Sequence, residues 1–257
     1  MNPPELIIIK NNAWLEKQRH AGKVVAQCLS AAEKIIKNEP GTTLKHIESI
    51  CEKIILDGNC SPTFKNYKGY PGVICASVNE VLVHGIPSNY KIKSGDIIKI
   101  DVGATYDGVI GDAAITAICG NPINKRHEEL VSVCKKALDI GIEISNPGRR
   151  IGEIGYVIDK FVEEHGFNVI DTYGGHGINI HRLHAPPFVP NKSDEYSGIR
   201  IVEGMSFTIE PMITWGGNKT KVSPKDGWSV RTGNMSAHFE HTLFIGSKCA
   251  EIITKLE

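Results

Sequence analysis

The stretch PGTTLKHI at residues 40–47 has a counterpart in PGRRIGEI at residues 147–154, which begins 107 residues further along the chain. The two share proline, glycine, an aliphatic residue and isoleucine at matching positions, and each opens a helical pattern. A second pair, SGDIIKID at 94–101 and EGMSFTIE at 203–210, places a carboxylate six residues after a glycine, at nearly the same separation. This self-similarity indicates a duplicated half-domain rather than chance.

Each copy begins with helices and continues into strands. Apolar residues spaced three and four apart predict helices at 14–36, 44–55 and about 125–144. Short β-branched runs punctuated by glycine predict strands at 73–85, 96–103 and 109–118. Two such halves pair most naturally about a pseudo-twofold axis, with their strands merged into one antiparallel sheet and the helices packed on it. We therefore predict a single α+β domain over 1–257, with repeat units at about 40–120 and 147–250.

The chain has balanced charge, with 29 basic and 29 acidic residues among 257. No overall field therefore draws it to nucleic acid or to an anionic bilayer. The opening MNPPELIIIK has an apolar run too short for a signal peptide or a membrane span. The cysteines are odd in number and contain no C-x-x-C pair, which argues against structural zinc and a disulfide framework. We predict a cytoplasmic protein without DNA or membrane partners.

Four carboxylates converge in this arrangement. Asp101 and Glu210 occupy equivalent positions in the two halves, and an Asp-Gly turn returns Asp112 alongside Asp101. Glu240 lies in an apolar segment, where an acid requires a partner. Taken singly, each acid is compatible with a turn or a strand end. In one cleft they repel one another unless they are protonated or neutralised, and divalent cations are the simplest compensation.

The stretch YGGHGINIHRLHAPP at 173–187 adds three histidines, His176, His181 and His184. An isolated histidine is more often an ordinary surface or core residue, so the residues alone leave open which of the three binds metal. Carboxylates with an imidazole suit manganese, ferrous iron, cobalt or zinc. A water shared by two such ions becomes hydroxide near neutral pH and attacks a polarised carbonyl, so we predict hydrolysis.

Six segments, covering almost the whole chain in order, resemble motifs of the type I methionine aminopeptidases. They are NEVLVHGIP (79–87), KIDVGATYDGVIGDAA (99–114), GGHGI (174–178), LHAPP (183–187), GMSFTIEPM (204–212) and SAHFEHTLFI (236–245). The resemblance implies the pita-bread fold, a curved antiparallel sheet covered by helices. It also implies removal of the initiator methionine from nascent polypeptides whose second residue is small, by a short bacterial form of the enzyme that acts as a monomer in transient contact with the ribosome.

The resemblance further implies a site for two divalent metal ions, Co²⁺, Mn²⁺, Fe²⁺ or Zn²⁺. Its five implied ligands are Asp101, Asp112, His176, Glu210 and Glu240. Asp112 and Glu240 would bridge both ions, Asp101 would complete one, and His176 with Glu210 would complete the other. Glu210 is also implied to take a proton from the attacking water.

Other implied roles concern the substrate. His84 is expected to hydrogen-bond the amide at the scissile bond, and His184 to stabilise the negative charge that develops on the carbonyl. His181 has no family role and is interpreted as a local or exposed residue. The methionine pocket is implied to contain Tyr67, Tyr70, Cys75 and Trp228. Positions that hold a monovalent cation, Na⁺ or K⁺, in relatives correspond to Asn79, Val81 and Ser236.

Two features depart from the family pattern. His176 and His184 are eight residues apart, one more than is usual, and Leu183 replaces an aromatic residue. Two alternatives stay open: a proline-directed peptidase of the same fold, whose relatives usually carry a large extra amino-terminal domain, and a metal-free binding protein. A small basic patch could touch ribosomal RNA, although a solvated face is favoured. Its residues are Lys91, Lys93 and Lys99.

Overall fold

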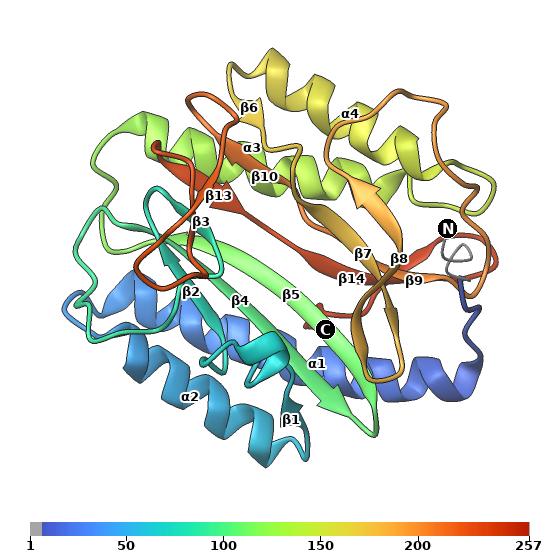
Figure 1. Ribbon diagram of the computed structural model, residues 1–257, viewed down its shortest axis with the longest axis horizontal. Coiled ribbons are helices and arrows are strands. Elements are labelled where there is room, and N and C mark those ends of the chain that lie inside the picture. The colour runs from blue at the N-terminus through green and yellow to red at the C-terminus, as the bar shows by residue number, and fades with distance from the viewer. Residues whose placement is uncertain (1–6, 257) are drawn as a thin grey trace.

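The computed structural model describes residues 7–256, so the first six residues of the MNPPELIIIK segment lie outside the described part. Two pairs of helices lie on opposite sides of a central set of strands in Figure 1. They are α1 (Asn12–Asn38), α2 (Leu44–Asp57), α3 (Lys125–Glu143) and α4 (Ile151–Glu164), with a short 3-10 turn η1 (Tyr67–Gly69). None of the helices in residues 7–256 combines the length and apolar character needed to cross a bilayer.

The strands pair antiparallel throughout the described residues. The first half supplies β1 (Ser61–Pro62), β2 (Cys75–Val78), β3 (Val81–Val83), β4 (Ile97–Tyr106) and β5 (Val109–Ile118). The second half supplies β6 (Asn168–Val169), β7 (Gly174–Asn179), β8 (Arg182–Pro190), β9 (Ser206–Ile209), β10 (Met212–Thr214), β11 (Lys221–Val222), β12 (Val230–Arg231), β13 (Ser236–His238), β14 (His241–Ile245) and β15 (Ala250–Ile252). The two largest groups have the orders β1-β4-β2, with β5 on β4, and β15-β14-β9-β7-β8.

The duplicated motifs open equivalent helices. α2 begins after its N-cap Thr43 and α4 after its N-cap Arg150. The glycines two residues earlier, Gly41 and Gly148, both have positive φ, 98° and 94°, a conformation that favours glycine because it has no Cβ. Isolated bridges tie the two caps to equivalent points further along the chain, Lys91 and Arg200. The predicted α+β architecture with duplicated halves is confirmed.

Side chains along β4 alternate between the face of the sheet that packs on α1 and α2 and the opposite face. Ile100 and Val102 pack in one core with α1 and α2, whereas Asp101 between them points the other way. Asp101 pairs with Ala114 of β5, two residues from Asp112. Because positions two apart share a face, the hairpin places both acids on the face that is turned away from α1 and α2.

Candidate metal centre

A cavity of about 620 Å³ borders this face and draws its lining from both halves of the chain. Cavities of this size are typical of ligand sites. Its polar lining includes Asp101, Asp112, His176, Glu210, His238 and Glu240. The structure therefore brings the five predicted metal ligands together with one histidine that was not predicted.

Backbone contacts fix the segments that carry the acids. Glu240 follows β13, and its N–H donates to the carbonyl of Ala114 at 2.9 Å, which places it beside β5. Asp112 donates its N–H to the Thr242 hydroxyl at 3.0 Å, and that hydroxyl donates to the Asp112 carbonyl at 2.7 Å. Glu210 follows β9, and its carbonyl accepts from the Asn191 amide at 2.9 Å. Carboxylates from distant parts of the chain are thus held in one place.

The four acids lie in an environment that disfavours their charge. Burial raises the pKa of Asp101, Asp112, Glu210 and Glu240, and the neighbouring carboxylates raise the last three further. Among the described residues, one buried oxygen each of Asp101, Asp112 and Glu240 has no hydrogen-bond partner. Unpaired buried carboxylate oxygens are costly unless a cation or a proton satisfies them. This donor set therefore fits divalent cations.

His176 presents one ring nitrogen to the acids. Its Nε2 lies 3.7 Å from Oδ2 of Asp112 and 3.8 Å from Oε1 of Glu210. Its Nδ1 lies 3.2 Å from the carbonyl oxygen of Gly177, which can only accept, so Nδ1 carries the proton. Burial lowers the pKa of His176 to about 4 and keeps the ring neutral. A neutral imidazole with its second nitrogen fixed in this way is the usual form of a metal ligand.

His238 is the site residue that sequence reasoning missed. It is buried, neither ring nitrogen has a hydrogen-bond partner among the described residues, and its Nε2 lies 3.7 Å from Oε2 of Glu210. It precedes Glu240 by two positions, so period-two alternation within SAHFEH could have placed both side chains on one face. The prediction instead followed only the histidines of the 173–187 stretch.

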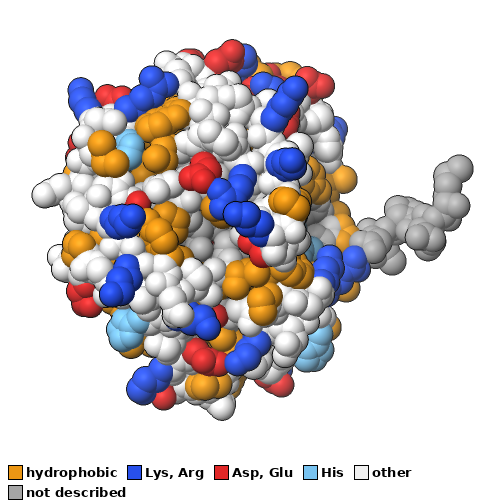
Figure 2. All heavy atoms as spheres, turned by 60° about the vertical axis from the view of Figure 1, so that its left-hand side comes forward, with side chains coloured by type: hydrophobic (Ala, Val, Ile, Leu, Met, Phe, Trp, Pro, Cys, Tyr) orange, Lys and Arg blue, Asp and Glu red, His pale blue; other side chains and the backbone are white. Residues whose placement is uncertain are grey.

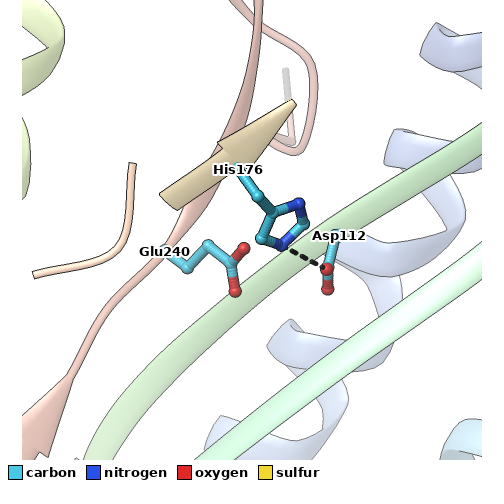
Figure 3. Close-up of side chains that lie close together, drawn as sticks. All are labelled: Asp112, His176 and Glu240. Atoms are coloured by element: carbon cyan, nitrogen blue, oxygen red, sulfur yellow. Dashed lines mark ion pairs between the residues drawn. The ribbon is translucent and has the colours of Figure 1, made fainter. Parts of the chain in front are cut away.

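Two ligand groups overlap in the cavity. Asp112, His176 and Glu240 form one, and Glu210, His238 and Glu240 form the other, each with ligand atoms within 4.8 Å of one another. Figure 3 shows the first group, with His176 extending from β7 toward the two carboxylates. Because Glu240 belongs to both groups, the geometry fits two neighbouring cations that share a carboxylate. Asp101 lines the same cavity beside Asp112.

Two of the other predicted histidines, His84 and His184, border the cavity. The ring of His184 lies 4.4 Å from that of His176, and its Nδ1 is 2.9 Å from the Tyr67 hydroxyl. The register of β7 and β8 shifts just after His176, which accommodates the unusual eight-residue spacing. His84 also lines the cavity and has a φ of 59°, a strained value for a residue with a Cβ. His181 is exposed in the β7–β8 turn, as expected.

An apolar wall adjoins the acidic cluster. Tyr70 and Cys75 are buried in it, and the Tyr70 and Trp228 rings meet edge to face at 5.2 Å. The Tyr70 hydroxyl is 2.9 Å from the carbonyl of Gly85, which fixes its orientation. Leu183, the departure noted in the sequence, is buried in the same wall.

One prediction is corrected by the structure. Lys99 is only 1% exposed, so it cannot belong to a basic surface patch with Lys91 and Lys93, which are both exposed. Lys99 lies on β4 with its side chain on the same face as Asp101, and burial lowers its pKa to about 7. Its Nζ contacts oxygens of Asn79 and Ser236, two of the residues expected at the monovalent cation site. Val81 begins β3, close to Asn79 in the chain.

Comparison with known proteins identifies the family. A model described as metallopeptidase family M24 matches residues 16–247. Methionine aminopeptidase of Mycoplasma capricolum is 39% identical over 254 residues, covering 98% of this chain and 100% of that protein. Methionine aminopeptidase 1 of Bacillus subtilis is also 39% identical, over 253 residues, with the same coverage. The chain belongs to the methionine aminopeptidases of metallopeptidase family M24.

Solved methionine aminopeptidases agree with the structure. That of Thermotoga maritima superposes with a TM-score of 0.94 at 41% identity, covering 98% of this chain and 100% of the other. The prolidase of Pyrococcus furiosus superposes with a TM-score of 0.78 at 23% identity, and the match spans only 66% of that longer protein. The predicted pita-bread fold is thereby confirmed, and methionine aminopeptidases match over their full length where the prolidase does not.

Proposed function

We propose that this methionine aminopeptidase removes the initiator methionine from new polypeptides whose second residue is small, with two divalent cations at the centre described above. One observation carries the proposal: two ligand groups share Glu240 inside a cavity that is continued by an apolar wall. The relatives that match nearly the whole chain are named for the same activity, which supports the proposal.

The cations would be held by the five predicted ligands. Asp101, Asp112, Glu210, Glu240 and His176 would hold the ions between them, with Glu240 common to the two ligand groups. When bound, the ions activate water and polarise the scissile carbonyl. Manganese, ferrous iron, cobalt and zinc all accept this mixture of carboxylate oxygens and imidazole nitrogen.

The remaining polar groups would orient the substrate. His184, whose Nδ1 lies 2.9 Å from the Tyr67 hydroxyl, would donate to the carbonyl oxygen as negative charge develops on it. His84, which lines the cavity from the first half of the chain, would hydrogen-bond the peptide amide. Glu210 would accept the proton of the attacking water.

The apolar wall would receive the methionine side chain. Tyr67, Tyr70 and Trp228 offer aromatic surfaces, and Cys75 offers a small polarizable thiol next to Asp101 in the β2–β4 ladder. Such surfaces suit an unbranched thioether. Because the wall adjoins the ligands, a side chain bound there would bring the first peptide bond of the substrate to the cations.

A peptide panel tests the activity. We expect turnover of Met-Ala-Ser, abolished by a chelator and by Glu210→Gln, and none of Xaa-Pro peptides. His181→Ala, an exposed histidine outside the cavity lining, serves as the matched control and is expected to retain full turnover. Cleavage of Xaa-Pro peptides in place of Met-Ala-Ser would favour the proline-directed alternative. Absence of bound divalent ions under anaerobic, metal-replete conditions would favour a non-catalytic binding protein.

We further propose that the enzyme acts as a monomer in the cytoplasm, in transient contact with the ribosome. Nascent amino termini are its proposed substrates, and they first become accessible there. On the face drawn in Figure 2, basic side chains are interspersed with acidic and apolar ones, in keeping with the balanced charge of the chain. Gel filtration tests the monomer, and cosedimentation with ribosomes at increasing salt tests the contact.

A further inference from the structure

Lys99 is an unusual buried residue because the described structure gives it no salt bridge to a carboxylate. It ranks among the largest fully buried side chains of residues 7–256, at 1% exposure. Lysine is almost never buried without a partner, since removing an ammonium group from water is costly. The fold must therefore offer the Lys99 amine hydrogen-bond acceptors other than carboxylates.

Three oxygens surround the Lys99 amine. Its Nζ lies 2.7 Å from the carbonyl of Asn79, 3.3 Å from the carbonyl of Ser236 and 3.4 Å from the Ser236 hydroxyl. The hydroxyl hydrogen is directed to the Asn79 carbonyl at 3.0 Å, so toward Nζ the Ser236 hydroxyl acts as an acceptor. Three acceptors match the three N–H donors of an ammonium group, whereas a neutral amine has only two donors and a lone pair. The contacts therefore fit the charged form.

The oxygen cluster is held rigidly. Asn79 adopts a φ of 56°, a left-handed conformation that asparagine tolerates better than most residues. Its side chain accepts from the N–H of Ile97 at 2.9 Å and donates to Asp96 at 3.0 Å. The N–H of Ser236 donates to the Asn79 carbonyl at 3.3 Å. Clustered backbone carbonyls of this kind replace the hydration shell of a small cation.

We propose that the ammonium group of Lys99 is the built-in monovalent cation of this enzyme and takes the place of a bound Na⁺ or K⁺ ion. The expected ion site at Asn79, Val81 and Ser236 does not fit this chain, because oxygens of Asn79 and Ser236 already coordinate Nζ. The tethered charge joins the β2–β3 turn of the first half to β13 of the second. β13 leads directly to Glu240, so Lys99 is a positioning residue for the metal centre.

Thermal unfolding of the metal-free protein tests this directly, without reference to turnover. The wild type is compared in NaCl, KCl and tetramethylammonium chloride of equal ionic strength, with the tetramethylammonium salt of EDTA. We expect equal midpoints in all three, because a bound ion would raise the midpoint by mass action and tetramethylammonium is too large for the site. Crystals of the wild type soaked in thallium(I) are expected to show no anomalous peak among these oxygens.

Two substitutions of Lys99 distinguish the effect of its charge from the effect of the space that its side chain fills. Lys99→Ala removes the ammonium and leaves room for an ion, so its lowered midpoint is expected to recover by about 4 °C in KCl or NH₄Cl and to show a thallium peak at Asn79 and Ser236. Lys99→Met fills the space without charge and is expected to show no recovery. Lys93→Ala, which changes an exposed lysine, is the matched control and is expected to unfold like the wild type.

Three outcomes would overturn the proposal. They are a saturable rise of the wild-type midpoint with K⁺ or Na⁺, a thallium peak at these oxygens in the wild type, and a folded Lys99→Ala variant that no monovalent cation stabilises. The wild-type measurements decide the matter even if both Lys99 variants fail to fold.

Discussion

Replacing Asp101 by asparagine is expected to stabilise the metal-free protein at alkaline pH. Burial raises the pKa of the Asp101 carboxyl from 3.8 to about 7. A carboxyl whose pKa is raised on folding stabilises the fold fully below its unfolded pKa and loses that contribution as pH rises through the folded pKa. The loss for Asp101 therefore runs from about pH 4 to about pH 7. Asparagine has nearly the same shape and suffers no such loss, because it does not ionise.

The expected gain in stability follows from the size of the pKa shift of Asp101. A rise of about three pH units corresponds to about 4 kcal/mol at about 1.4 kcal/mol per unit. For a chain of this length each kcal/mol moves the unfolding midpoint by about 2–4 °C, so Asp101→Asn is expected to unfold roughly 8–16 °C above the wild type in EDTA at about pH 8. Near about pH 3 the gap is expected to close, since the carboxyl is then largely protonated in both folded and unfolded chains.

Urea and thermal unfolding in EDTA at these two pH values measure the gap. In saturating Mn²⁺ the wild type is expected to be more stable than Asp101→Asn, because it gains the binding energy of ions that the variant holds less tightly. A variant that is less stable than the wild type in EDTA at about pH 8 would refute the reasoning. So would a gap of equal size at both pH values, since that would indicate packing rather than ionisation.

Three further variants test the cavity. His238→Gln is expected to weaken Mn²⁺ binding about tenfold by calorimetry, because the amide lacks the unpartnered ring nitrogen beside Glu210. Trp228→Ala removes the edge-to-face contact with Tyr70 and is expected to raise KM for Met-Ala-Ser about tenfold with kcat largely kept; a loss confined to kcat would contradict a role in the pocket. His184→Ala is expected to lower kcat about 100-fold with little change in metal binding, and normal kcat would exclude it from charge stabilisation.

The acidic part of the site was predictable because its placement depends on local rules. The turn at Asp107 and Gly108 sets the β4–β5 register, and alternation then puts Asp101 and Asp112 on one face. The duplicated motifs predicted by symmetry that the segment 203–210, which carries Glu210, lies at the position equivalent to 94–101. The order of the helices also follows from the spacing of apolar residues alone.

Lys99 and His238 were not predictable in the same way. Nothing local distinguishes a strand lysine that faces solvent from one that another segment covers, so Lys99 was grouped with its exposed neighbours in the chain. The β2–β3 turn at Asn79 and the packing of β13 against the first half bury it. The importance of His238 likewise depends on Glu210, which lies between β9 and β10 and approaches only in the folded protein.

The metal centre brings together segments whose carboxylates repel one another. The hydrogen bonds that hold these segments together do not involve the carboxylates. Thr242 and Asp112 exchange two hydrogen bonds, Glu240 and Ala114 exchange backbone bonds, and the Thr116 hydroxyl both donates to the His238 carbonyl at 2.6 Å and accepts its N–H at 2.9 Å. These reciprocal pairs fix residues 112–116 of β5 against 238–242 at every second position.

Ionisation of the acids therefore raises the negative potential of the cavity without separating the strands. Four carboxylates carry four negative charges, and burial keeps the His176 ring neutral. Two divalent ions balance that charge, whereas monovalent ions in the same two positions leave half of it uncompensated. A cavity whose acids reach this charge on ionising favours paired divalent cations over the far more abundant Na⁺ and K⁺, and the tethered ammonium of Lys99 supplies the single positive charge needed at the neighbouring oxygens.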